Sequence, residues 1–174
     1  CAGATTIVDY YRMPDALARA AEAFGLRAML GGRVMDADSA ALANGQFVHD
    51  PHLGEATLGA ALELIDTWDA KGDNRISTIL APHAPDTCSR QMLQTFADLS
   101  AKTGKQVHTH LAQSRMEVAQ VRSREGLSPA ELLEDAGLLS PNLVAAHCIF
   151  LDDADVRRVG QAGVVINHAP IGNA

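Results

Sequence analysis

Short β-branched runs alternate with helical stretches along the whole chain, and no other feature limits its fold as strongly. The runs are apolar without strict polar alternation, as expected for strands that are buried on both faces of a sheet. Because a helical stretch separates each pair of runs, the pattern predicts parallel strands joined by right-handed crossovers. The expected strands are Thr5–Tyr11, Arg27–Met35, Ile76–Ala81, Gln106–Leu111, Leu143–Leu151 and Gly163–Asn167.

Five expected helices carry recognisable start and stop signals. Proline suits a first helical position, serine and aspartate cap the free amides of a first turn, and glycine ends a helix. Residues Ser128 to Glu131 form a capping box with proline inside it. The expected helices run from Pro14 to Gly25, over Glu55–Ala70, from Ser89 to Gly104, from Ser128 to Gly137, and onward from a cap at Asp152 or Asp153.

Composition is typical of a soluble globular protein and excludes several classes. Apolar residues make up 47% of the 174 and charged residues 20%, enough to bury a core and too apolar for disorder. No apolar run approaches the roughly 20 residues of a membrane span, and the first residues do not form a signal peptide. We therefore expect no membrane partner.

The net charge and the cysteines indicate which classes of partner and which cellular compartment to expect. The net charge is −7, and the 14 basic residues are scattered, which argues against a nucleic-acid groove or an anionic membrane surface. Three widely spaced cysteines, Cys1, Cys88 and Cys148, form no C-x-x-C pair. This usage indicates a reducing, cytoplasmic setting rather than a disulfide framework or a zinc knuckle.

Two architectures fit the alternation, an open doubly wound sheet and a closed (β/α)₈ barrel. Four histidines fall at or just after the ends of expected strands, and in a barrel those ends converge on one central site. The nucleotide-binding glycine motifs of open sheets are missing, which also favours the barrel. The four histidines are His83, His110, His147 and His168.

The strongest local signal for chemistry is the pair His108 and His110. Residues i and i+2 of a strand share a face, and neutral imidazoles suit zinc or ferrous iron. Two hydrogen-bonded polar residues at a strand end are the alternative, and the pair alone does not separate them. His83 sits between Pro82 and Pro85, which stiffen its loop. His147 lies in an apolar run, where a lone histidine is more often a hydrogen-bonded core residue.

For the other potentially reactive side chains we expect structural or solvent-exposed positions rather than catalytic roles. We expect His49 and His52 to be solvated residues of a loop over residues 44–53. Cys88 has no convincing base nearby, so we expect a small buried residue or the start of a helix rather than a nucleophile. Asp9 ends the first expected strand, where it either supports the backbone or lines a pocket.

Six segments together resemble the amidohydrolase superfamily, and most of all its branch of cytosine, guanine and S-adenosylhomocysteine deaminases and triazine chlorohydrolases. They are G-A-T-T-I-V-D (3–9), L-A-P-H-A-P-D-T-C-S (80–89), V-H-T-H-L-A-Q (107–113), G-L-S-P-A-E-L-L (126–133), L-V-A-A-H-C (143–148) and H-A-P-I-G-N (168–173). The resemblance implies a (β/α)₈ barrel of which about strands two to seven lie in this chain. Residues 1–174 would then be part of one barrel domain.

The resemblance also implies roles for individual residues. His110 would be a metal ligand, with His108 as a second candidate, and His147 would lie beside the metal-activated water. His83 would contact substrate, and the pocket floor would be formed by His168 to Asn173, with Gly172 where serine is usual. No lysine lies at the end of the fourth strand to bridge two metals, so one divalent ion is expected, zinc first and iron as the alternative.

Gln113 departs from the family pattern, which usually has a proton-shuttling glutamate there. An amide can hydrogen-bond a ring nitrogen but cannot act as a general acid or base. The implied activity is water attack on a ring carbon of a small aminoheterocycle, most simply deamination of a purine- or pyrimidine-like substrate. A triazine-type C–N or C–Cl hydrolase and a non-catalytic ligand-binding relative are the alternatives, and Gln113 favours the latter. Homo-oligomerisation stays open.

Length sharpens this interpretation. A (β/α)₈ barrel typically needs ~250 residues, and six strands do not close one. The family's other metal ligands lie on strands one and eight, which the resemblance does not cover here. We therefore expect these 174 residues to be the central stretch of a longer enzyme and to be inactive alone.

Overall fold

A computed structural model describes residues 3–170 and 173, and within these residues six parallel strands follow one another in chain order. Strands β1, β2 and β3 form one three-stranded sheet, and β4, β5 and β6 form a second. Each observed strand lies inside one of the six predicted runs and is shorter than it. The strands are β1 (Thr6–Asp9), β2 (Arg27–Leu30), β3 (Ile76–Thr78), β4 (Val107–Leu111), β5 (Leu143–His147) and β6 (Val165–Asn167).

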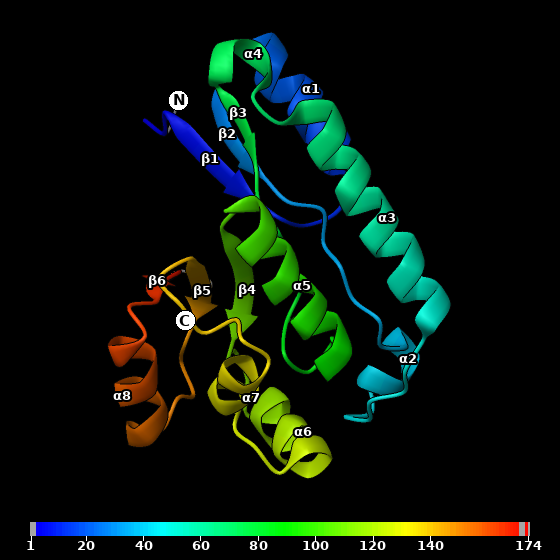
Figure 1. Cartoon of the computed structure of the whole chain (residues 1–174), viewed down its shortest axis with the longest axis vertical. Helices are drawn as coiled ribbons and strands as arrows, with labels where there is room; N and C mark the ends of the chain where they lie inside the picture. The colour runs from blue at the N-terminus through cyan, green and yellow to red at the C-terminus, as the bar shows by residue number, and fades with distance from the viewer. Residues whose placement is uncertain (1–2, 171–172, 174) are drawn as a thin grey trace.

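The extended segment 79–83, which continues β3, joins the two sheets. On one side the N–H of His83 donates to the Val34 carbonyl at 2.8 Å. On the other side the Leu80 carbonyl accepts the N–H of His108 at 2.8 Å, and the His83 carbonyl accepts the N–H of His110 at 3.0 Å. The six strands therefore follow one continuous path, and all their carboxyl ends face the same edge (Figure 1).

Helices cover the outside of both sheets (Figure 1). Helices α1 and α3 pack against β2 and β3, while α6, α7 and α8 form a contiguous group beside the second sheet. Their bounds are α1 (Pro14–Phe24), α2 (Ser39–Leu42), α3 (Pro51–Trp68), α4 (Lys71–Asn74), α5 (Arg90–Thr103), α6 (Arg115–Glu125), α7 (Pro129–Asp135) and α8 (Asp153–Gln161).

The predicted helix caps are confirmed where the sequence carried a side-chain signal. The Ser89 hydroxyl accepts the N–H of Met92 at 3.1 Å, and both halves of the Ser128–Glu131 capping box are present. Asp152, rather than Asp153, caps α8. These caps satisfy amides that would otherwise lack partners in the first turn, so they fix where each helix begins.

Three helices were missed, and the start of a fourth was wrong. Helices α2 and α4 have four residues each, and α6 is too polar to show a clear apolar stripe. Helix α3 begins at Pro51, capped by Asp50, so His52 lies in a helical first turn and not in a loop.

Burial on both sheet faces holds for the central strands and fails at the outer ones. Strands β4 and β5 are largely buried, whereas Val8 of β1 and Val165 of β6 are about half exposed. The outer strands pair on one side only among the described residues, so one flank of each lacks a neighbour.

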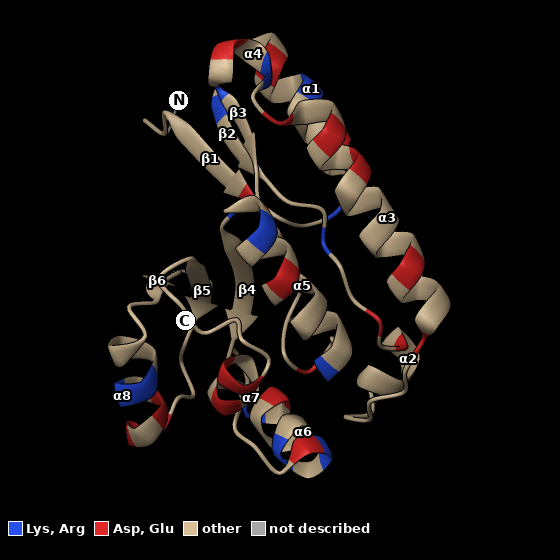
Figure 2. Cartoon of the chain, viewed as in Figure 1, with Lys and Arg blue, Asp and Glu red and all other residues tan. Residues whose placement is uncertain are grey.

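Two apolar clusters form the core. One lies between the second sheet and helices α5 to α8 around Phe96, Leu111 and Leu132, and the other joins α1 and α3 to the first sheet around Leu30 and Ile76. Charged residues of both signs are interspersed over the helices, without a basic stripe in the view of Figure 2. Among the described residues, no helix combines the length and apolarity needed to span a bilayer.

Candidate functional site

The carboxyl edge of the sheets brings together three of the four predicted histidines. His110 lies near the end of β4, His147 ends β5, and His83 lies on the segment that joins the sheets. The ring centres of His83 and His110 are 4.8 Å apart, and those of His110 and His147 are 5.3 Å apart. His110 is therefore the centre of the cluster, and parallel pairing of the strands is what places it there.

Backbone geometry fixes the tautomer of His110. Its Nδ1 lies 2.8 Å from the His83 carbonyl oxygen, which can only accept a hydrogen bond. Nδ1 therefore carries the proton, and Nε2 keeps a free lone pair. Burial lowers the pKa of His110, and the neighbouring His147 and Arg33 lower it further. A neutral imidazole with Nε2 free is the form that binds a metal ion.

His83 is held in the same way by a side chain. Its Nδ1 lies 2.9 Å from the Thr87 hydroxyl, whose own proton is directed at the Ala84 carbonyl. The Thr87 oxygen is then the acceptor, so His83 also keeps Nε2 unprotonated. Burial, with His110 and Arg33 nearby, lowers the pKa of His83 to about 3. This ring stays neutral and presents an acceptor.

His147 ends β5 in a backbone conformation that side chains rarely adopt. Its φ is 73°, and that of Cys148 is 57°, both in the left-handed region. Its Nδ1 lies 2.6 Å from the amide oxygen of Asn173, so Nδ1 donates and Nε2 is free. The same Asn173 amide reaches His168 Nδ1 at 3.5 Å. His147, Asn173 and His168 thus form one chain of contacts, while Gly172 lies outside the described residues.

His108 shares the inward face of β4 with His110, as the i, i+2 spacing predicts. Tyr10 packs against both rings, with ring centres 4.3 Å from His108 and 4.9 Å from His110. Both ring nitrogens of His108 are buried without a hydrogen-bond partner among the described residues, and so is the Tyr10 hydroxyl. Burial lowers the pKa of His108 to about 4. The alternative interpretation of this pair, two hydrogen-bonded polar residues, is therefore wrong for His108.

Gln113 lies on the loop that leaves β4, and its side chain is exposed. Its backbone N–H donates to Glu117 at 2.8 Å. The structure brings this residue to the same edge as the histidines, and its amide makes no hydrogen bond to a described residue. Gln113 is therefore free to meet a ligand, but it does not belong to the cluster of rings.

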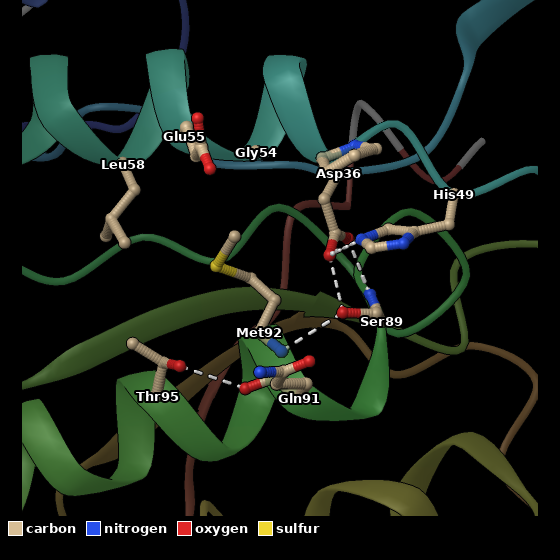
Figure 3. Close-up of a pocket in the computed structure, with 10 residues that line it drawn as sticks. Asp36, His49, Gly54, Glu55, Leu58, Ser89, Gln91, Met92 and Thr95 are labelled. Carbon is tan, nitrogen blue, oxygen red and sulfur yellow. Dashed lines mark hydrogen bonds and ion pairs between the residues drawn. The ribbon is translucent and has the colours of Figure 1, made fainter.

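A cavity lies outside the histidine cluster, between α3 and α5 (Figure 3). Buried Asp36 accepts hydrogen bonds from the backbone and hydroxyl of Ser89, and His49 Nε2 lies 3.2 Å from the same carboxylate. The His49 side chain is half exposed, as expected for a solvated residue. Cys88 is fully buried, and burial raises its pKa to about 12, so the prediction of a small buried residue is confirmed.

The ring nitrogens of the cluster could supply at least one ligand to a metal ion. His110 Nε2 is a neutral, uncommitted nitrogen, and His108 supplies two more unpartnered ring nitrogens. Over residues 3–170 and 173, no three histidine, cysteine, aspartate or glutamate side chains are grouped so as to hold an ion by themselves. A metal at this edge would need ligands besides those of the described residues.

Sequence reasoning missed three residues that shape the cluster. Thr87 sets the His83 tautomer, Tyr10 packs on two histidines, and Glu117 holds the loop after β4. Only Glu117 left a signal, since Ser114 and Glu117 have the spacing of a capping box. Thr87 and Tyr10 gain their roles from contacts that no local pattern encodes.

Known proteins resemble this chain over nearly its whole length. Curated relatives include a 5-methylthioadenosine/S-adenosylhomocysteine deaminase from Pyrococcus abyssi, 35% identical over 98% of the chain. Another is a 5'-deoxyadenosine deaminase from Methanosarcina barkeri, 33% identical over 98%. The chain spans 38% and 37% of these two proteins, respectively.

Solved structures share the fold. An adenosine deaminase from Xanthomonas campestris with bound zinc superposes with a TM-score of 0.80 at 27% identity, covering 97% of this chain and 36% of that one. A mutant atrazine chlorohydrolase from Arthrobacter aurescens TC1, complexed with zinc and atraton, gives a TM-score of 0.81 at 22% identity, covering 95% and 38%.

The family assignment rests on the complete chain. A model of the amidohydrolase family matches residues 1–174, which include every histidine of the cluster. The six-stranded parallel arrangement and the superpositions agree with that match. The resemblance seen in the sequence motifs is thus confirmed: the chain belongs to the amidohydrolase family.

Proposed function

We propose that the protein carrying this chain is a metal-dependent hydrolase that removes an amino group from a purine- or pyrimidine-like ring. One observation supports this above the others: three imidazoles at one sheet edge each direct Nδ1 at a protein acceptor. Each ring therefore keeps Nε2 unprotonated, ready to bind a metal, take up a proton or accept a hydrogen bond. The deaminase relatives support ammonia as the leaving group.

His110 is the proposed metal ligand, through Nε2, and His108 is the second candidate. When bound, a divalent ion lowers the pKa of water toward neutrality and polarises the ring carbon. Zinc is the proposed ion, supported by the zinc in the superposed adenosine deaminase, with iron as the alternative. The hydrogen bond from His110 Nδ1 to the His83 carbonyl holds the ring in the orientation that ligation requires.

His147 is the proposed acceptor for the proton of the attacking water. In the neutral ring Nε2 is the acceptor, because the Nδ1–H donates a hydrogen bond to the Asn173 amide oxygen, and this hydrogen bond also fixes the plane of the ring. The proton held by His147 passes to the amine, the C–N bond breaks and ammonia leaves, while the second proton of the water ends on the ring nitrogen beside the new carbonyl. Gln113 donates its amide N–H to a ring nitrogen in this scheme, and it orients the substrate without protonating it.

His83 is the proposed substrate contact. Its neutral ring offers Nε2 as an acceptor, which suits a ring N–H or an exocyclic amine of a heterocycle. His168 and Asn173 are proposed to form the pocket floor, supported by their mutual contact at 3.5 Å. The substrate class is therefore a small heterocycle that carries both donors and acceptors on its ring.

The described strands are proposed to be strands two to seven of a (β/α)₈ barrel, within one domain that covers residues 1–174. Six consecutive parallel strands support this, as does the span of only 36–38% of the relatives. The remaining metal ligands would then come from strands one and eight. The described thiols, Cys88 and Cys148, are free, which supports a reducing, cytoplasmic setting.

Metal analysis combined with an ammonia-release assay tests the proposed function. The purified full-length protein that carries this chain should contain about one divalent ion per chain, and it should release ammonia from some member of a panel of aminopurines, aminopyrimidines and aminotriazines. Chelation should abolish release, and added zinc should restore it. A metal-free protein that is inert on the whole panel would contradict the proposal, and halide release without ammonia would point to the triazine chlorohydrolase chemistry.

Replacing Gln113 with glutamate should raise deaminase turnover, on the order of 10-fold, because a carboxylate can carry the proton that the amide cannot. Steady-state rates of ammonia release measure the effect. Gln91→Glu, an exposed amide-to-acid change beside the cavity between α3 and α5, is the matched control and should leave the rate unchanged. No change or a loss on Gln113→Glu would show that the glutamine is adapted to different chemistry.

A further inference from the structure

Two helices begin with the same sequence pattern, serine followed three residues later by glutamate, and use it differently. In α7 the Ser128 hydroxyl accepts the N–H of Glu131, and the Glu131 carboxylate accepts the N–H of Ser128 at 2.8 Å. This reciprocal pair is an ordinary capping box. In α6 the Ser114 hydroxyl accepts the N–H of Glu117 at 3.0 Å, but the Glu117 carboxylate does not return to Ser114.

The Glu117 carboxylate instead binds the chain where it leaves β4. Oε1 accepts the N–H of Ala112 at 2.7 Å, and Oε2 accepts the N–H of Gln113 at 2.8 Å. Ala112 has a φ of 49°, a left-handed conformation that costs free energy for any residue with a Cβ. The two hydrogen bonds oppose that cost, so the turn after His110 depends on this carboxylate.

The held segment also touches the exit of β5. The Leu111 carbonyl accepts the N–H of Cys148 at 2.9 Å, and the Ala112 carbonyl accepts the N–H of Phe150 at 3.0 Å. Glu117 thus supports the loop that carries Gln113 and, through the next layer of hydrogen bonds, the loop that follows His147. The hydrogen bonds of Glu117 to described residues go to Ala112, Gln113 and Ser114, and none goes to a histidine of the cluster.

Burying the Glu117 carboxylate without a cationic partner lowers the stability of the folded state. Glu117 is 3% exposed, and no lysine or arginine among the described residues forms an ion pair with it. The charged group that faces it is Asp86, from the loop after His83, which disfavours its charge. The nearby Cys148 thiol stays neutral, because burial and Glu117 raise its pKa to about 11. Burial and Asp86 together raise the pKa of Glu117 to about 7. An unpaired buried carboxylate is a poor way to stabilise a helix end, since a capping box on the surface serves as well.

We propose that Glu117 is a positioning residue of the site: it holds the 112–113 peptides so that the Gln113 side chain meets the substrate and the β4 and β5 exits keep their spacing. This inference rests on the proposed deaminase function. Only the ionised carboxylate accepts both N–H groups, because protonation turns one oxygen into a donor. The hold therefore strengthens as the pH rises through the pKa of Glu117.

Glu117→Gln tests the proposal, with Glu131→Gln as the matched control in the ordinary capping box. The first variant keeps the shape but turns an NH₂ toward a backbone N–H. We expect kcat for ammonia release to fall about 10- to 100-fold with KM within about threefold, because a misplaced loop slows the chemical step. The metal content should stay at one ion per chain. The rise of kcat with pH near neutrality, present in the native protein, should be lost in Glu117→Gln and kept in Glu131→Gln.

Amide hydrogen exchange gives a readout that does not need turnover. Protection at Ala112 and Gln113 should fall in Glu117→Gln, while protection in α7 and β5 stays native. Unchanged protection at these two amides overturns the proposal whatever the assay shows. Equal losses of kcat in both variants, in proportion to their losses of Tm, overturn it as well. A native protein that releases no ammonia contradicts the deaminase function instead, and it leaves the exchange result as the measure of the Glu117 contacts.

Discussion

Replacing His110 with alanine should remove the bound metal and lower kcat/KM for ammonia release by at least about 10³-fold, because a ligand and the activated water are lost together. His110 lies at the centre of the ring cluster. A backbone carbonyl, that of His83, fixes the tautomer of its ring and leaves Nε2 free. Elemental analysis of the dialysed protein and the ammonia assay measure the two effects separately.

Two further variants control the His110 experiment. His49→Ala removes a half-exposed imidazole from the cavity between α3 and α5 and should leave metal content and activity native. His108→Ala compares the second candidate ligand: a similar loss of metal would assign both rings to the ion, while retained metal would leave His110 as the ligand. A His110→Ala protein with a full complement of metal and native turnover would remove the basis of the proposed site.

Replacing His147 with alanine should lower kcat by about 10²- to 10⁴-fold while the metal stays bound, because a general base is lost without a ligand. The loss should be larger than that of Asn173→Ala, which keeps the ring but frees Nδ1 from its acceptor at 2.6 Å. Measuring kcat together with metal content distinguishes the two roles. A His147→Ala protein that loses its metal would instead make this ring a ligand.

Much of the fold could be predicted because its signals are local. Strand runs, capping serines and terminal glycines act within a few residues, so all six strands and five of the helices were found, although α3 begins four residues earlier than expected. Helix α6 escaped because its apolar stripe is weak, and it is held by packing and by Glu117 instead. The exposed outer strands were not foreseen, since exposure depends on which strand lies alongside.

Local sequence patterns also predicted part of the candidate site and not the rest. Its histidines could be found from sequence because parallel strands all present their carboxyl ends at one edge, wherever the chain goes between them. The pair His108 and His110 followed from the two-residue period of a strand. The sequence pattern could not show whether each ring is a hydrogen-bond acceptor, a metal ligand or a buried ring without a hydrogen-bond partner.

By itself, then, the sequence determined the order of strands and helices, the edge that carries the site, and the identity of the rings that gather there. Only the tertiary structure decided the proton on each ring, because the acceptors come from distant parts of the chain. His110 depends on a carbonyl 27 residues away, and His147 on an amide 26 residues away. The direction of the Glu117 carboxylate was decided there too, since one serine–glutamate pattern serves a cap in α7 and a loop of the site in α6.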